Sequence, residues 1–167
     1  MANTTFLIIQ IGKVLQLEYA MNAVAKGETA LGIRGKDCVV LAVEKKLHSI
    51  LIEEGSYQKM QLVTEHVGGT YAGLGPDFRV LMSEARQYTQ EEKLKLGEPI
   101  YLSNLAQETA SIAQEYTMRG GVRPFGISIL FAGYDDDGAH LYQIDPSGAY
   151  VGKKNTLASA RFWSYGA

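Results

Sequence analysis

The sequence of 167 residues is poor in features that mark several large classes of proteins. Its one cysteine, Cys38, excludes an internal disulfide and any metal cluster built from cysteines, and it favours a reducing compartment. A net charge of −2 gives no basic surface of the kind that binds nucleic acid. The apolar stretch at residues 6–11 is too short to span a bilayer, and no basic region precedes it. We therefore expect no nucleic acid partner, no membrane and no secretory signal.

Metal ligands are also sparse. The three histidines, His48, His66 and His140, lie far apart and share no ligand spacing, so solvated or core histidines are the simpler interpretation. The acidic run at residues 135–137, followed by Gly138, lacks the spaced ligands and terminal glutamate of a calcium loop. It predicts a hairpin turn instead. We expect neither a metal ion nor another cofactor.

Motifs for nucleotide binding and nucleophilic catalysis are missing. Residues 73–76 lack the Lys-Ser/Thr of a phosphate-binding loop, and Pro76 removes a backbone donor, so a tight strand-to-helix turn is expected. Ser147 stands beside a glycine, but without the Gly-x-Ser-x-Gly pattern it predicts only a turn after a strand. Cys38 precedes an apolar run, which favours a buried, inert thiol within a strand.

What is present is the composition of one folded domain. Hydrophobic residues make up 46% and charged residues 20% of the chain, and no repeat or long linker interrupts it. Spacing predicts a helix over 13–26, strands over 30–34, 39–43, 60–63 and 67–72, helices over 76–96 and 102–116, and strands from 127 and over 141–144. Helices that separate two groups of strands favour an α+β layered domain.

Residues 114–126 are the most informative stretch. They combine a helix end, the break at Gly120 and Gly121, an Arg-Pro turn and the start of an apolar strand. In that strand Ile127 and Ile129 alternate with smaller residues, which predicts a strand buried on one face.

Five blocks of this chain resemble the α-type subunits of the proteasome core particle. They keep the family's order and spacing, cover about residues 12–157, and comprise residues 12–20 with a Gln-x-Glu-Tyr-Ala core, 39–46, 71–81, 123–126 and 145–150. The Gly-Pro-Asp-Phe-Arg-Val-Leu variant at residues 75–81 looks most like the type-2 class of that family.

The resemblance implies a four-layer αββα sandwich of the N-terminal nucleophile hydrolase type. Two antiparallel sheets would be flanked by helices, without the last strands and helices of the family. Residues 1–11 would correspond to the N-terminal gate segment of the family. This segment is divergent, because the family's Tyr-Asp gate motif and its proline are absent there. Residues 12–167 would form a single, C-terminally shortened domain whose last seven residues are unlike the family.

The resemblance also implies a subunit without catalytic residues. Catalytic relatives use an N-terminal threonine whose own amine serves as base. Here Thr29 has 28 residues before it, Glu28 stands about where that threonine would align, and no Gly-Thr processing junction is present. Thr29 is therefore expected to be an ordinary strand residue.

By the same resemblance the chain would be a structural subunit of the proteasome α ring, in the cytoplasm and nucleus. It would act in ring assembly, substrate gating and regulatory-particle docking during ubiquitin-dependent protein catabolism. The helix carrying Gln16, Glu18 and Tyr19 would pack between neighbouring subunits. Other α and β subunits would be its partners, and unfolded protein substrates would pass through the ring.

A pocket lined by Lys59, Gly27 and Leu74 would receive the C-terminal tails of regulatory ATPases or other activators, with Lys59 pairing the tail carboxylate. Without the resemblance, Lys59 reads as an exposed charge that leads into a strand. Two alternative functions stay open. One is a stand-alone, truncated α+β module that does not assemble, and the other is an active N-terminal nucleophile hydrolase.

Overall fold

The computed structural model describes residues 14–46, 49–153 and 157–159. The predicted gate segment at residues 1–11 and His48 lie outside these residues. The elements in chain order are α1 (Leu15–Lys26), β1 (Ala30–Arg34), β2 (Val39–Val43), η1 (Glu54–Ser56), β3 (Met60–Thr64), β4 (Val67–Gly73), α2 (Gly75–Leu96), α3 (Leu102–Met118), β5 (Ile127–Asp135), β6 (Gly138–Ile144), β7 (Tyr150–Gly152) and β8 (Leu157–Ser159).

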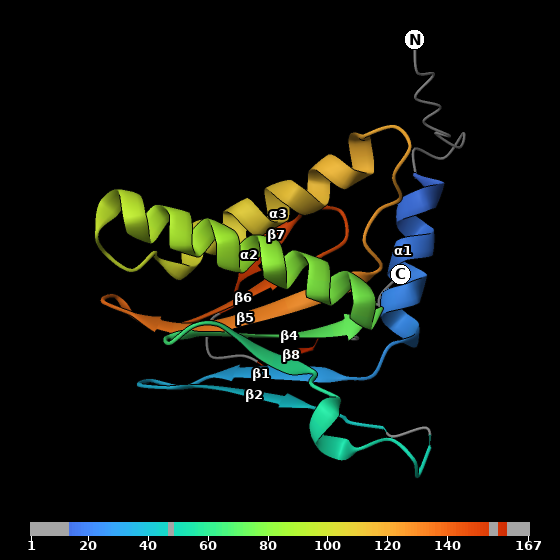
Figure 1. Cartoon of the computed structure of the whole chain (residues 1–167), viewed down its shortest axis with the longest axis horizontal. Coiled ribbons are helices and arrows are strands. Elements are labelled where there is room, and N and C mark those ends of the chain that lie inside the picture. Colours follow the sequence, from blue (N-terminus) through green and yellow to red (C-terminus); the bar gives the residue numbers. More distant parts are fainter. Residues whose placement is uncertain (1–13, 47–48, 154–156, 160–167) are drawn as a thin grey trace.

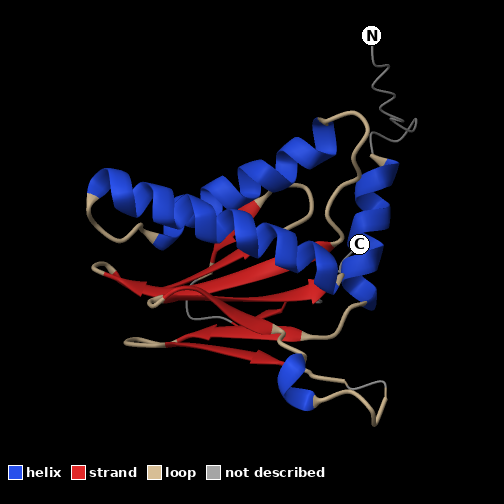
Figure 2. Ribbon diagram, in the orientation of Figure 1, coloured by secondary structure: helices blue, strands red, loops and turns tan. Residues whose placement is uncertain are grey.

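The strands form two antiparallel sheets. One has the order β3-β4-β5-β6-β7, and the other has the order β2-β1-β8. Figure 1 shows α2 and α3 on one side of the five-stranded sheet and β1 and β2 on its other side. The order of helices and strands agrees with the predicted α+β domain, and the sheets stack as an N-terminal nucleophile hydrolase sandwich requires (Figure 2).

The main core lies between the five-stranded sheet and the two long helices. Their apolar faces follow the helical period, so the same side of each helix turns to the sheet. The largest side chains in this core with at most 1% of their surface exposed are Phe78, Leu81, Met82, Leu102, Leu105, Ile129 and Phe131.

A second core lies between the two sheets. It contains Ala30, Ala72, Leu130 and Leu141, with Val24 of α1 at its side. Strand β5 is therefore buried on both faces from Ile127 to Gly133. The prediction that this strand is buried on one face was wrong, because helices cover one side of it and a second sheet covers the other.

The outer face of the three-stranded sheet carries apolar side chains. Ile33 is 49% exposed and its partner across the β1–β2 pair, Val40, is 55% exposed. Within the described residues, no helix lies over this face (Figure 1). Three of the four predicted layers are thus seen in this part of the chain.

Helix boundaries follow local chemistry. Pro76 stands in the first turn of α2, where its missing N–H is harmless. Gly97 ends α2 in the left-handed conformation, with φ of 76°, and its N–H donates to the carbonyl of Lys93. Among the described helices, none joins the length and the apolar character that crossing a bilayer needs.

Candidate functional site

Three glycines bring distant backbone segments into contact beside α1. A Cβ on Gly27 would lie 2.2 Å from the backbone nitrogen of Gly73, and a Cβ on Gly73 would lie 2.2 Å from the carbonyl oxygen of Gly126. Gly73 also has a φ of 117°, which other residues rarely adopt. The α1–β1 junction, the β4–α2 junction and the loop before β5 therefore pack backbone against backbone.

Leu74 lies at this contact, directly before α2. Its N–H donates to the carbonyl of Gly126 at 3.1 Å. Its side chain lies against the same residue, because a Cβ on Gly126 would lie 2.9 Å from Leu74 Cδ1. Since 44% of Leu74 is nevertheless exposed, a fixed backbone presents an apolar side chain at the surface.

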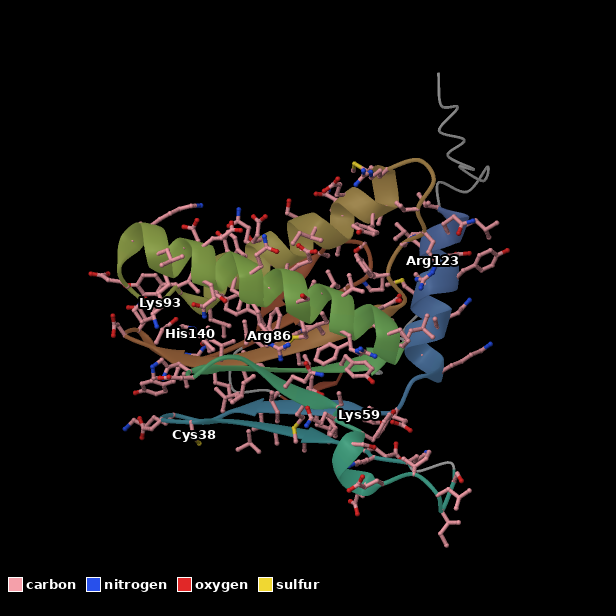
Figure 3. All side chains as sticks on the ribbon, in the orientation of Figure 1. Cys38, Lys59, Arg86, Lys93, Arg123 and His140 are labelled. Carbon is pink, nitrogen blue, oxygen red and sulfur yellow. The ribbon has the colours of Figure 1, made fainter. Side chains whose placement is uncertain are left out.

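Lys59 is buried, with only 4% of its surface exposed. Its Nζ donates to the Glu28 carboxylate and to the carbonyl oxygen of Glu44 at 3.2 Å, and it lies 5.5 Å from the centroid of the Tyr71 ring. The interpretation of Lys59 as an exposed charge was therefore wrong. The fold surrounds the ammonium with the partners that a buried cation needs. Figure 3 shows Lys59 toward the α1 end of the sheets, away from Cys38.

Tyr71 connects Lys59 to a small cavity. The cavity has a volume of about 300 Å³, and its lining includes Tyr57, Tyr71, Phe78 and Arg79. The rings of Tyr71 and Phe78 stack with centroids 4.3 Å apart. Burial raises the pKa of Tyr71 to about 12, and Tyr57 and the Glu28 carboxylate add to this shift. The phenol therefore stays neutral at physiological pH.

The three residues predicted to line a pocket lie around one corner of the molecule. Glu28, which pairs with Lys59, is the chain neighbour of Gly27. Gly73, which packs against Gly27, is the chain neighbour of Leu74. The structure thus brings the three predicted residues together, and their binding role stays a prediction.

A second ion pair braces the same corner. Arg123 donates from Nη1 and Nη2 to the two carboxylate oxygens of Asp77, both at 2.7 Å, and the Gly126 N–H donates to Asp77 Oδ2 at 2.9 Å. Burial by itself would raise the pKa of Asp77, but these hydrogen bonds and the guanidinium charge hold it below its ordinary value. The Arg-Pro-Phe-Gly segment is thereby tied to the first turn of α2.

The exposed side of α1 carries the residues predicted for ring assembly. Ala20 and Val24 are buried against the domain. Tyr19 is 57% exposed, Gln16 is exposed and Glu18 is partly exposed. This face is available to a neighbour, and its role in assembly stays a prediction.

Thr29 lies directly before β1. Its carbonyl oxygen accepts a hydrogen bond from the Glu44 N–H at 2.9 Å, as a residue next to a strand pair does. Its nitrogen is part of the peptide bond that follows Glu28. Thr29 therefore has no free amine to activate its hydroxyl.

Cys38 is exposed, so the expectation of a buried thiol was wrong. It lies in the β1–β2 turn just before β2, which is the edge strand of its sheet, and its carbonyl accepts from the Gly35 N–H at 2.8 Å. An edge position next to a turn leaves the side chain without a covering layer.

The remaining candidates lie at or near the β5–β6 hairpin turn. Asp135 ends β5, and its Oδ1 accepts from the Asp137 N–H at 3.2 Å, which makes the acidic run a hairpin turn as predicted. His140 Nε2 lies 3.1 Å from the same oxygen. In the described parts of the chain, no three His, Cys, Asp or Glu side chains are grouped so that they could hold a metal ion.

Two contacts had no signal in the sequence. Glu28 and Lys59 are 31 residues apart, and Asp77 and Arg123 are 46 residues apart. Neither spacing follows from a helix or a hairpin. The family resemblance placed Glu28 near the position of a catalytic threonine, but this did not mark it as the partner of Lys59.

Comparison with known proteins identifies the family of this chain. Residues 24–161 match the family described as "Proteasome subunit". The chain is 51% identical over 143 residues to proteasome subunit alpha type-2-B of Arabidopsis thaliana, covering 86% of this chain and 61% of that protein. It is 50% and 47% identical over 145 residues to proteasome subunit alpha type-2 of Dictyostelium discoideum and of Drosophila melanogaster, covering 87% of this chain and 62% of each relative.

The chain thus spans somewhat less than two thirds of the length of these relatives. The match nevertheless extends over most of the chain itself and includes both sheets, the glycine contacts and Lys59. The resemblance predicted from the five sequence blocks is confirmed, and the chain belongs to the proteasome subunit family.

Proposed function

We propose that this chain is a non-catalytic structural subunit of the proteasome core α ring. Its similarity to proteasome subunit alpha type-2 proteins over most of its length is the observation that carries the proposal. In that role it contributes to ring assembly, to gating of substrates and to docking of regulatory particles. Other α and β subunits are its partners, and unfolded substrates pass through the ring in the cytoplasm and nucleus.

The proposal of a non-catalytic subunit is supported by Thr29. A threonine nucleophile of this fold needs its own free amine as base. Thr29 follows Glu28 in an unbroken chain, and its carbonyl belongs to the pairing of β1 with β2. Nothing at this position generates an activated hydroxyl.

Assembly would use the exposed side of α1, with Gln16, Glu18 and Tyr19 packed between neighbouring subunits. Residues 1–11 would form the gate segment ahead of a single domain over residues 12–167. An exposed tyrosine supports an interface because it supplies a large, rigid contact area at low entropic cost.

Docking would use the corner built by Lys59, Gly27 and Leu74. The ammonium of Lys59 would pair with the terminal carboxylate of an ATPase or activator tail, and Leu74 would contact an apolar side chain of that tail. Gly27 keeps the backbone close enough to Gly73 for the corner to form.

Native size separation of the tagged full chain from cells, followed by mass spectrometry, tests the main proposal. We expect co-migration with α and β subunits in one large particle. Migration near the 18.3 kDa of the single chain, without those subunits, would contradict it.

A second experiment tests docking in the same particle. Lys59→Ala should weaken binding of an activator-tail peptide at this pocket by about tenfold or more, because a desolvated charge pair is lost. Lys93→Ala removes an exposed lysine near the opposite end of the domain and should leave binding unchanged (Figure 3). Normal tail binding by the Lys59 variant would rule out this pocket.

A further inference from the structure

We propose that the Glu28 carboxylate competes with the tail carboxylate for the Lys59 ammonium. Glu28 then occupies the Lys59 pocket until a tail displaces the Glu28 side chain. This inference rests on the proposed docking function and names the residue that regulates it. Glu28 is then a determinant of affinity at this pocket, in addition to the three residues that line it.

The Lys59 ammonium is already occupied by partners within the chain. The side chain of Lys59 is 3% exposed and that of Glu28 is 15% exposed. One donor direction of the ammonium points to the Glu28 carboxylate, one points to the Glu44 carbonyl, and the Tyr71 ring lies 5.5 Å away. An arriving carboxylate therefore finds no solvent-facing ammonium, and it must take the place of the carboxylate already bound.

Glu28 offers Lys59 the same chemical group, a carboxylate, that the C-terminus of a tail would offer. Replacing one carboxylate by the other leaves the charge of the site unchanged and the ammonium paired. The exchange avoids the large cost of leaving a buried charge without a partner.

The Glu28 side chain is the part of the ion pair that has to move. Gly27 is held by its close contact with Gly73, and Lys59 is held because its carbonyl accepts from Thr70 Oγ1 at 3.1 Å. Glu28 lies between α1 and β1, outside any helix or strand. A rotation of its side chain, which gives up its contact with Lys59 and its other interactions, opens the site without moving either element.

The contact also has the form that exchanges easily. A lysine ammonium is a point charge that accepts a carboxylate from several directions, whereas an arginine fork fixes two parallel hydrogen bonds. Lys59 makes one contact to one carboxylate oxygen of Glu28. A second carboxylate can approach the ammonium as Glu28 leaves.

The consequence is a lowered apparent affinity. When only a fraction of the molecules has an open site, the apparent dissociation constant rises by the inverse of that fraction. Removing the charge of Glu28 raises the open fraction. Tail binding should therefore become tighter, which is the opposite of the effect expected for a residue that helps to hold the tail.

The test uses the particle that contains the tagged full chain and a fluorescent octapeptide ending in Leu-Tyr-Ala with a free carboxylate. Glu28→Gln keeps an oxygen that accepts from Lys59 but removes the charge, and Glu28→Ala removes both. Both variants should lower the dissociation constant of the peptide, by about tenfold. Glu65→Gln, which neutralises an exposed carboxylate in the β3–β4 turn, is the matched control and should have no effect.

A measurement on the wild-type chain covers the case in which neither variant folds. Carbodiimide labelling of Glu28, read by mass spectrometry, should increase when the peptide saturates the particle, because the displaced carboxylate enters solvent. The same peptide with a C-terminal amide should cause no increase. Unchanged or reduced labelling of Glu28 on peptide binding would overturn the inference.

The outcomes separate the two proposals. Assembly with wild-type peptide binding that Glu28→Gln leaves unchanged or weakens overturns the competitor role and leaves the ring subunit intact. Failure of the chain to enter the particle overturns the proposed function, and the inference falls with it. Binding that appears only in the Glu28 variants supports the inference in its strongest form.

Discussion

Two ion pairs stand at the same corner of this domain and are built in different ways. Arg123 donates hydrogen bonds to both carboxylate oxygens of Asp77, and the Gly126 N–H donates to the same carboxylate. Lys59 makes a single contact to the Glu28 carboxylate, and its second hydrogen bond goes to a carbonyl. The hydrogen bonds of the Asp77 pair fix the relative orientation of its two side chains. The single contact of the Lys59 pair requires only that the partner carries a negative charge.

Their burial differs in the same sense. In the Asp77 pair the aspartate side chain is 8% exposed and the arginine side chain is 61% exposed, so the cationic member keeps the greater contact with water. In the Lys59 pair the cation is the more deeply buried member. A buried cation with one replaceable carboxylate suits a binding pocket, whereas a buried carboxylate held by three donors suits a structural brace.

The largest effect on stability is expected from breaking the Lys59 pair. Glu28→Gln leaves the Lys59 ammonium, whose side chain is 3% exposed, without a counter-charge, which should lower the free energy of unfolding by about 3 kcal/mol. Denaturant unfolding of the full chain measures this. The double variant with Lys59→Met, which keeps the side-chain volume and removes the ammonium, should recover more than half of the loss, and no recovery would show that the two side chains are not coupled.

A smaller loss is expected from the brace. Asp77→Asn replaces one acceptor oxygen by an amide NH2 group that can only donate, so either the buried Gly126 N–H or an Arg123 N–H loses its acceptor, which should lower the free energy of unfolding by about 2 kcal/mol. Asp136→Asn, in the exposed hairpin turn, is the control and should stay within about 0.5 kcal/mol of the wild type. Equal free energies of unfolding for Asp77→Asn and Asp136→Asn would show that Asp77 contributes no more to stability than an exposed carboxylate does.

The Asp77–Arg123 ion pair should also make the free energy of unfolding depend on pH. The folded pKa of Asp77 lies below its ordinary value of 3.8, so its contribution is present above that value and is lost as pH falls through the folded pKa. The difference in unfolding free energy between the wild type and Asp77→Asn should therefore shrink in acid. A constant difference would contradict the assignment.

Asp145 supplies a control of opposite sign. Burial raises its pKa, against hydrogen bonds from Gln143 and Ser128. Its contribution is present below the unfolded pKa and is lost as pH rises through the folded pKa. Asp145→Asn should therefore gain stability relative to the wild type as pH rises, whereas Asp77→Asn should lose it.

The smallest effect on stability is expected on the exposed side of α1. Tyr19→Ser should change the free energy of unfolding by less than about 0.5 kcal/mol, because the side chain lies outside the core. It should nevertheless reduce the share of the chain found in large particles on native gels. Met118→Ser is matched in exposure, at 57% for each residue, and should assemble normally.

The sequence predicted what depends on local spacing. The hydrophobic period placed α2 and α3, residues 73–76 marked the turn into α2, and the acidic run with Gly138 marked the hairpin that pairs β5 with β6. Each of these signals lies within a few residues of the feature that it predicts. The corner at Lys59 was predicted from the family resemblance and not from a local pattern.

What the sequence did not predict depends on how distant segments stack. The full burial of β5 follows from a second sheet on its far side, and the exposure of Cys38 follows from an edge position in that sheet. The pairs Lys59–Glu28 and Asp77–Arg123 join side chains 31 and 46 residues apart. No periodicity within one element carries such contacts.

Electron cryomicroscopy of the particle purified through a tag on this chain is the most direct test of the proposed ring role. We expect to find the chain in an outer ring, with α1 against a neighbouring subunit and Lys59 at the boundary between two subunits. An outer ring without the chain, or a chain whose Lys59 corner lies away from every subunit boundary, would overturn the proposed role.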